Sequence, residues 1–181
     1  DGPSTTQWLA EAFGSQPVHH AIDAAVEHLA PLALSRDVVI ETAIEADAMS
    51  AAPACLYPVI ANGLRNAIEA SPRGGLVELT ATVEANTTTI EDEQNAGETL
   101  VITVIDRGTS LTTIDPERAF TLGYTTKPSG AGVGLPLSRS LIEHEGGTLT
   151  LRHDHERGVT LFRVRLPLPP ATGAGDLDRS I

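Results

Sequence analysis

The sequence predicts an α+β fold of two layers, in which helices cover one face of a mixed, mostly antiparallel sheet. Strand-like runs occur as adjacent pairs instead of alternating strictly with helices, which favours antiparallel pairing. Three segments with helical periodicity separate these runs. The length of 181 residues is sufficient for one domain with a substantial core.

The amino-terminal half contains two predicted helices and one predicted strand. Residues 1–16 are expected to be a leader or the end of a preceding helix. Apolar residues recur every three or four positions from His19 to Leu34, which predicts a helix, and the β-branched run 37–45 predicts a strand. A second helix is predicted from Ser50, as its N-cap, to about Ala70. Pro58 implies either a kink or a regular helix that begins only there.

The carboxy-terminal half contains four predicted strands, one helix and one long loop. A connection as long as this loop is usually functional or disordered in a compact domain. The predicted elements are strands 76–84 and 99–106, loop 107–131 with a short helical piece around 116–120, helix 132–145, and strands 148–153 and 159–166. We therefore assign one domain to residues 17–168, followed by a Pro/Gly-rich tail or linker at 169–181.

Composition narrows the functional classes. The net charge of −12 argues against binding to nucleic acid or to an anionic membrane surface. The single cysteine, Cys55, excludes a disulfide within the chain and fits a reducing compartment. No apolar run approaches the roughly 20 residues of a membrane span. Because Met49 is the only methionine, the chain lacks a start methionine, and we expect it to be a fragment of a longer parent. We expect this fragment to be cytoplasmic and leave open whether the parent is anchored in a membrane.

Small and hydroxylated residues are concentrated within 120–147. Glycines at alternate positions let backbone N–H groups approach a phosphate, and the helix that follows adds the positive end of its dipole. The segment predicts a loop that closes over the phosphates of a nucleotide; the alternative is an ordinary flexible connection. Its candidate residues are Thr125, Thr126, Lys127, Gly130, Gly132 and Gly134.

Two asparagines mark the predicted helix 50–70. Asn62 and Asn66 are four residues apart and therefore share one helical face. Mg²⁺ prefers oxygen ligands, keeps several waters and is often held jointly with substrate phosphates, so an amide oxygen suits it. The alternative is that both side chains only form hydrogen bonds within the fold.

A third candidate position lies at the end of the predicted strand 99–106. A carboxylate at Asp106 can accept from the exocyclic amine of adenine, whereas it would reject guanine, since guanine presents a carbonyl there. Gly108 would let a flat base approach the backbone. The alternative is an aspartate that merely initiates a turn.

The order of these segments resembles the ATP-binding domains of sensor histidine kinases, within the wider superfamily that includes gyrase, Hsp90 and MutL. The resemblance covers about residues 18–168. Residues 62–70, NGLRNAIEA, resemble the N box, and Asp106-Arg107-Gly108 resembles the first glycine box. The segment FTLGYTTK, 120–127, is similar to the F box and ATP lid, and GAGVGLPLSRSLIEHEGG, 130–147, to the second glycine box.

The resemblance implies a Bergerat-type sandwich that binds Mg-ATP between the helices and the lid. Asn66 would coordinate Mg²⁺, Asn62 would line the phosphate region, and Asp106 would bind adenine N6 above Gly108. Asn62, Asn66 and Lys127 would be the catalytic residues. The resemblance assigns the remaining nucleotide contacts to Thr125, Thr126, Lys127, Gly130, Gly132, Val133, Gly134, Leu135 and, beside an adenine-side water, Thr160.

Two positions bear on mechanism. The first glycine box of the family usually reads Asp-x-Gly-x-Gly, but Ser110 replaces its last glycine, which puts the flexibility of the lid hinge in doubt. Hydrolysing members of the superfamily carry glutamate at the position of Asn62. An amide is no general base, so simple ATP hydrolysis is disfavoured. Transfer to a histidine needs mainly positioning and charge neutralisation.

The phosphate acceptor is expected outside this chain. His19 and His20 lie where the domain begins and are not followed directly by an acidic residue, so we interpret them as surface residues. The expected partners are a dimerisation domain of the same parent and, indirectly, a response regulator, while the fragment itself is expected to be monomeric. The alternatives are a serine kinase of the anti-sigma-factor type and a degenerate nucleotide-binding or interaction module, which Ser110 motivates.

Overall fold

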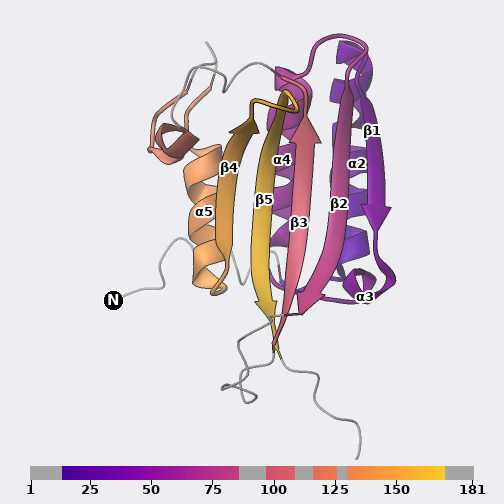
Figure 1. Cartoon of the computed structure of the whole chain (residues 1–181), viewed down its shortest axis with the longest axis vertical. Coiled ribbons are helices and arrows are strands. Elements are labelled where there is room, and N and C mark those ends of the chain that lie inside the picture. The colour runs from indigo at the N-terminus through magenta and orange to yellow at the C-terminus, as the bar shows by residue number, and fades with distance from the viewer. Residues whose placement is uncertain (1–13, 86–96, 109–115, 126–129, 170–181) are drawn as a thin grey trace, which may run out of the picture.

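Five strands form one sheet in the computed structural model, which describes residues 14–85, 97–108, 116–125 and 130–169. Their spatial order is β1-β2-β3-β5-β4 (Figure 1). β1 pairs with β2 in parallel, and every other neighbouring pair is antiparallel. The strands are β1 (Val39–Ile44), β2 (Leu76–Ala85), β3 (Glu98–Asp106), β4 (Thr148–Asp154) and β5 (Val159–Leu168).

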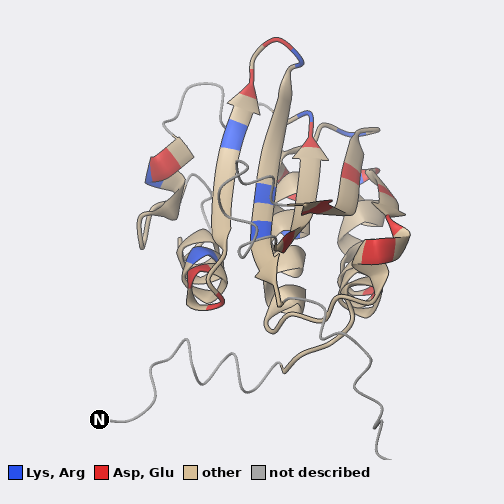
Figure 2. Ribbon diagram, turned by 60° about the horizontal axis from the view of Figure 1, so that its bottom comes forward, with Lys and Arg blue, Asp and Glu red and all other residues tan. Residues whose placement is uncertain are grey.

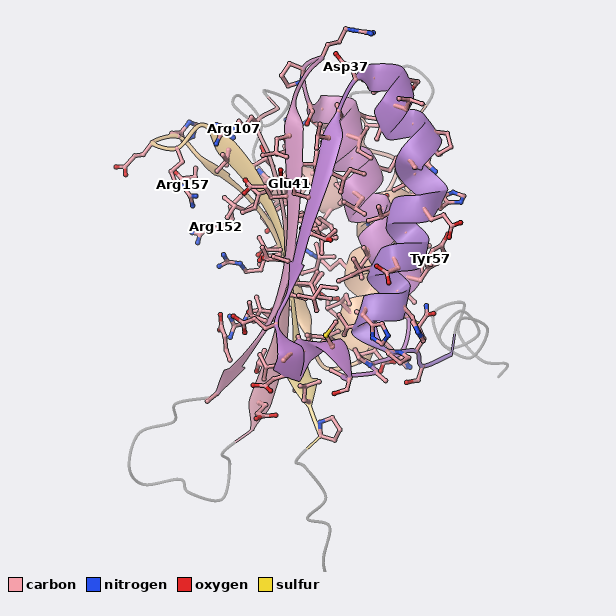
Figure 3. The ribbon with its side chains drawn as sticks, turned by 90° about the vertical axis from the view of Figure 1, so that its right-hand side faces the viewer. Asp37, Glu41, Tyr57, Arg107, Arg152 and Arg157 are labelled. Atoms are coloured by element: carbon pink, nitrogen blue, oxygen red, sulfur yellow. The ribbon has the colours of Figure 1, made fainter. Side chains whose placement is uncertain are left out.

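The helices form a second layer on one side of this sheet. Seen along the plane of the sheet, the three longer helices lie on the same side, as predicted from the order of elements (Figure 3). These are α2 (Val18–Arg36), α4 (Leu56–Ala70) and α5 (Gly134–His144). Two short helices, α3 (Ala46–Met49) and the 3₁₀ helix η2 (Pro116–Phe120), complete the described elements. The predicted two-layer α+β sandwich is therefore confirmed. No helix in the described ranges is long and apolar enough to cross a membrane.

Alternation along β2 explains why the helices cover one face only. Val77, Leu79 and Ala81 are buried against the helices, whereas the intervening side chains point to the open face. The core between the layers is filled mainly by aliphatic side chains, including Ile60 and Leu64 of α4. Burial of these apolar surfaces is what fixes α4 over the centre of the sheet.

Charges on the open face are sorted by strand. The charged residues of β1 and β2 are acidic, those of β5 are arginines, and β4 carries Arg152 together with Asp154 at its end (Figure 2). Arg107, Arg152 and Arg157 lie on the side away from the helices (Figure 3). Opposite charges meet at one point, where Arg165 and Glu84 form an ion pair of 2.8 Å.

The helix predicted from Ser50 to Ala70 is in fact shorter. Ser50 follows the short α3, and α4 begins only at Leu56, so the N-cap prediction for Ser50 is wrong. Pro58 is the third residue of α4, where its missing N–H breaks no intrahelical bond. The second alternative for this proline, a regular helix that begins near it, is thus confirmed.

Long-range backbone pairing explains the late start of α4. The Ala51 carbonyl accepts the Val18 N–H at 2.8 Å, and Ser15 and Ala54 form an isolated β-bridge. Backbone groups committed to the start of α2 are unavailable for a helix. The domain boundaries at 17–168 stay a prediction, since most of 1–16 and of 169–181 lies outside the described residues.

Candidate functional site

A cavity of about 780 Å³ opens between α4, the start of α5 and the sheet. This volume is typical of a site for a small molecule or cofactor. Most of its lining comes from the segments that the sequence analysis singled out: Asn62, Asn66, Asp106, Thr125, Gly130, Gly132, Val133, Gly134, Leu135 and Thr160. Segments far apart in the chain thus converge on one space.

One end of the cavity is built on adjacent strands. Asp106 of β3 is the cross-strand partner of Thr160 of β5, and both side chains are buried and line the cavity. The Gly108 N–H donates to Asp106 Oδ1 at 2.7 Å. Because the sequence analysis predicts that a nucleotide base lies beside Asp106, we refer to Asp106 and Thr160 as the base end of the cavity.

Burial changes the acidity of Asp106. Removal of its carboxyl from water raises the pKa to about 6, and the hydrogen bond from Gly108 opposes this shift. A ligand N–H directed at this carboxyl would favour the ionised form. The base end therefore suits a ligand that presents a hydrogen-bond donor, such as an exocyclic amine.

Gly108 is packed tightly against the end of α4. It does not appear among the cavity-lining residues. A Cβ at this position would lie 2.6 Å from both Cβ and O of Ala70, at the end of α4. The need for glycine here therefore comes from packing of the chain against α4, and contact between Gly108 and a base stays a prediction.

The opposite end of the cavity is built from helices. Asn62 Nδ2 of α4 donates to Ser138 Oγ of α5 at 3.0 Å, and Ser138 is buried. A Cβ at Gly134 would lie 2.5 Å from Asn62 Oδ1, so the first residue of α5 rests directly on the Asn62 amide. Because the sequence analysis predicts that phosphates lie beside them, we refer to Asn62, Asn66 and residues 130–134 as the phosphate end.

Gly123 and Gly132 lie against each other next to the phosphate end, and we call this pair the neck. The Gly123 N–H donates to the Gly132 carbonyl at 3.0 Å. Gly132 has φ +65, and a Cβ there would lie 2.5 Å from the Gly123 carbonyl carbon, so this position requires glycine. Thr125 lines the cavity. The predicted contacts of Thr126 and Lys127, and the question raised by Ser110, lie outside the described residues.

Arg139 anchors the chain before this neck. Its guanidinium donates to both carboxylate oxygens of Glu117, at 2.8 and 3.1 Å, and to the Leu149 carbonyl at 3.3 Å. It also lies 3.3 Å from the centroid of the Phe120 ring. The hydrogen bond from Arg139 is the main reason why the pKa of Glu117 is lowered. Sequence reasoning missed this anchor, since its residues are widely separated along the chain.

The sequence analysis also did not identify Arg36 and Arg65, two arginines that line the cavity. Arg65 precedes Asn66 on α4, and its place in the N box was the one signal for it. Arg36 comes from the last turn of α2 and donates through Nη1 to the Glu69 carbonyl at 3.0 Å. Cationic side chains suit an anionic ligand. Within the described ranges, no group of three or more His, Cys, Asp or Glu is arranged to hold a metal ion.

Comparison with known families and relatives identifies the same region. Residues 51–170 match the family described as histidine kinase-, DNA gyrase B- and HSP90-like ATPase. Sporulation kinase B of Bacillus subtilis is 28% identical over 134 residues, which cover 73% of this chain and 28% of that protein. Sensor protein TdiS of Thauera aromatica is 35% identical over 113 residues, which cover 62% of this chain and 19% of that protein. This chain thus spans about a fifth to a quarter of the length of these relatives.

Solved structures share the fold. The mycobacterial sensor histidine kinase MprB superposes with a TM-score of 0.65 at 20% identity, over 87% of this chain and 99% of that one. Full-length ShkA in complex with AMPPNP superposes with a TM-score of 0.64 at 21% identity, over 86% of this chain and 31% of that one. The architecture is therefore that of the catalytic domains of histidine kinases.

Proposed function

The chain belongs to the family of histidine kinase-, DNA gyrase B- and HSP90-like ATPases, and from this premise we propose that it binds Mg-ATP and donates the γ-phosphate to a histidine on a dimerisation domain of its parent protein. The observation that carries the proposal is the convergence of both ends on one cavity. Asp106 and Thr160, from the strands, and Asn62 and Asn66, from α4, line this one cavity. AMPPNP in the related structure of ShkA supports a nucleotide as the ligand.

Adenine is assigned to the base end. The Asp106 carboxylate would accept from the N6 amine, and guanine would place a carbonyl against the same acceptor. The phosphates would then lie toward Asn66 and the start of α5, where no side chain caps the helix and the N–H groups of Gly134 and Leu135 lack intrahelical partners. Asn66 would hold Mg²⁺ through its amide oxygen, and the ion would neutralise charge on the phosphates.

Position 62 favours transfer over hydrolysis. The Asn62 amide donates to Ser138 and rests against Gly134, so it serves as a link between α4 and α5. It has no titratable group with which to activate water. An imidazole acceptor is its own nucleophile, so transfer asks of this domain only that it bind and orient the nucleotide.

The acceptor domain would dock beside the neck. Leu122, Val133 and Leu137 are exposed large apolar side chains. Leu122 and Val133 flank the hydrogen-bonded pair Gly123–Gly132, and Val133 and Leu137 are four residues apart. Exposed apolar side chains grouped next to a ligand cavity are typical of a protein-binding surface. A response regulator would receive the phosphate from the acceptor domain in a later step.

Calorimetric titration with ATP and GTP, each with and without Mg²⁺, tests the binding step. We expect Mg²⁺-dependent binding of ATP and little binding of GTP. Asn66→Ala should remove the Mg²⁺ dependence, whereas Asn66→Asp, which keeps an oxygen ligand, should retain it. Equal affinity for ATP in the presence and absence of Mg²⁺ would contradict the metal assignment.

Phosphoryl transfer is tested by supplying the dimerisation domain of the parent protein together with labelled ATP. Acid-labile, base-stable label on that domain indicates phosphohistidine. Label on serine would favour the serine-kinase alternative. Tight ATP binding with no transfer to the supplied domain would favour a module without catalysis.

A further inference from the structure

We propose that His153 is a positioning residue for base recognition, which acts by setting the direction of the Thr160 hydroxyl group. The inference rests on the proposed function, because it concerns the base end of the same cavity. His153 lies on β4, one strand beyond the lining residues, and does not itself line the cavity. Neither the glycine-rich segments nor the asparagine pair involves it.

Three neighbouring strands contribute one residue each to a single row. The register pairs Asp106 of β3 with Thr160 of β5, and Thr160 with His153 of β4. His153 Nδ1 lies 3.3 Å from Thr160 Oγ1. Asp106 and Thr160 are each 6% exposed, whereas His153 is half-buried. The row therefore runs from the edge of the sheet to the buried carboxyl.

The ring of His153 is held on its other side as well. The His155 ring packs against it edge-on, with 4.7 Å between the ring centroids. The His155 ring thus lies beside the imidazole whose Nδ1 faces Thr160 Oγ1. Asp154, between the two histidines, is engaged elsewhere, since its Oδ1 accepts the backbone N–H groups of Glu156 and Arg157.

The chemistry follows from the single proton of a hydroxyl group. If His153 donates its Nδ1–H to Thr160 Oγ1, the hydroxyl proton is free to point into the cavity. If Nδ1 accepts that proton, Thr160 presents only lone pairs to a ligand. The histidine thus decides whether the base end offers a donor beside the Asp106 acceptor.

An adenine edge selects the first arrangement. Next to the N6 amine, which Asp106 would accept, adenine carries the ring nitrogen N1, an acceptor that needs a donor. Thr160 supplies this donor, directly or through one water, when His153 donates through Nδ1. Guanine reverses both groups, with O6 and N1–H at the same two places. The pair His153–Thr160 therefore reads N1, while Asp106 reads N6.

The test compares ATP with 1-deaza-ATP, which keeps the N6 amine but replaces N1 by C–H. Affinities of both nucleotides are measured by calorimetry for the chain and its variants. The chain itself should prefer ATP by about tenfold, the usual worth of one buried hydrogen bond. His153→Phe, which keeps a flat ring without nitrogen, leaves the Thr160 hydroxyl free to rotate and should therefore reduce this preference in part, by lowering the affinity for ATP only.

Three further variants separate positioning from a structural role. His153→Asn places an amide near the Nδ1 position and should restore most of the preference. Thr160→Val should abolish it, and adding His153→Phe should change nothing more, because both act through one hydroxyl group. His144→Phe, a change of an exposed histidine on α5, should leave the preference intact.

An unchanged preference for ATP over 1-deaza-ATP in His153→Phe would overturn the proposal while leaving ATP binding in place. If His153→Phe does not fold, unequal preferences of His153→Asn and the unmodified chain would decide against it. Failure of the unmodified chain to bind ATP would overturn both this inference and the proposed function, so the two failures are distinguishable.

Discussion

The base end and the phosphate end of the cavity are built in different ways. At the base end, Asp106 and Thr160 are neighbours in a sheet; Asp106 accepts the Gly108 N–H, and Thr160 Oγ1 lies 3.3 Å from His153 Nδ1. At the phosphate end, Asn62 and Gly134 come from separate helices that meet through one hydrogen bond and one close contact. The geometry of the base end is thus set by the register of the strands, whereas that of the phosphate end depends on a few contacts between helices.

Asp106→Asn tests the base end most severely. An amide N–H₂ facing the N6 amine should lower ATP affinity by about 100-fold, since a buried donor would meet a donor. Stability should change in the opposite direction and rise by about 2 kcal/mol at pH 7.5, because the variant no longer buries a carboxylate. Calorimetry and chemical unfolding measure the two effects. A loss of both ATP affinity and stability in Asp106→Asn would contradict the assignment of Asp106 to ligand recognition. Asp154→Asn, which lies outside the cavity, is the matched control.

The same carboxyl predicts a pH dependence of stability. Its pKa in the folded chain is raised to about 6 from an ordinary value of 3.8. Between these values the folded chain retains a proton that the unfolded chain has released. The Asp106 contribution is therefore present below pH 4 and is lost as the pH rises through 6. Unfolding curves across this window should show the loss in the unmodified chain and not in Asp106→Asn.

Gly132→Ala tests the neck of the phosphate end. The new Cβ would meet the Gly123 carbonyl carbon at 2.5 Å, in a backbone conformation with φ +65. We expect ATP affinity to fall by about 30-fold, equivalent to about 2 kcal/mol, because the segment at 130–134 must move. Gly158→Ala is the matched control, since Gly158 has φ +62 with open space around it. Equal effects of the two substitutions on ATP affinity would show that the contact at the neck is irrelevant to binding.

Gly134→Ala tests the contact between the helices. A Cβ at 2.5 Å from Asn62 Oδ1 should displace the amide or the start of α5 and lower ATP affinity by about tenfold. Asn62→Ala removes the group that the new Cβ would meet. In a double-mutant cycle the two changes should therefore be coupled by about 1 kcal/mol or more. Additive effects of the two substitutions on ATP affinity would mean that the contact between position 134 and Asn62 does not influence binding.

Glu117→Gln should have the smallest effect. It weakens the anchor that holds η2 to Arg139, and exposed ion pairs contribute about 1 kcal/mol or less. ATP affinity should fall by about two- to threefold. Because the pKa of Glu117 is lowered in the fold, its contribution is present at neutral pH and is lost as the pH falls through that lowered value. Glu84→Gln, which breaks the remote ion pair with Arg165, should leave ATP affinity unchanged.

The same contrast separates what the sequence could reveal from what it could not. Strand alternation and helical periodicity are local patterns, and they were sufficient to predict the sheet and the helical layer. The glycine and asparagine spacings, together with the family resemblance, predicted ten of the 22 residues that line the cavity. The late start of α4 depends on pairing of residues 51–55 with 14–18, which no local pattern encodes. Arg139, Ser138 and His153 act through partners distant in sequence or on another strand, so periodicity carried no signal of their roles.

The neck between Gly123 and Gly132 also has a consequence in polymer terms. Its hydrogen bond joins the two ends of a loop, and both ends are fixed to α5, one through η2 and Arg139 and the other by the continuous chain. The entropy of closing a loop grows only with the logarithm of its length, about 0.6 kcal/mol for each doubling. The length of the connection between these two glycines can therefore change at small cost to the fold. Variants with connections of other lengths would show how far the proposed nucleotide affinity depends on that length.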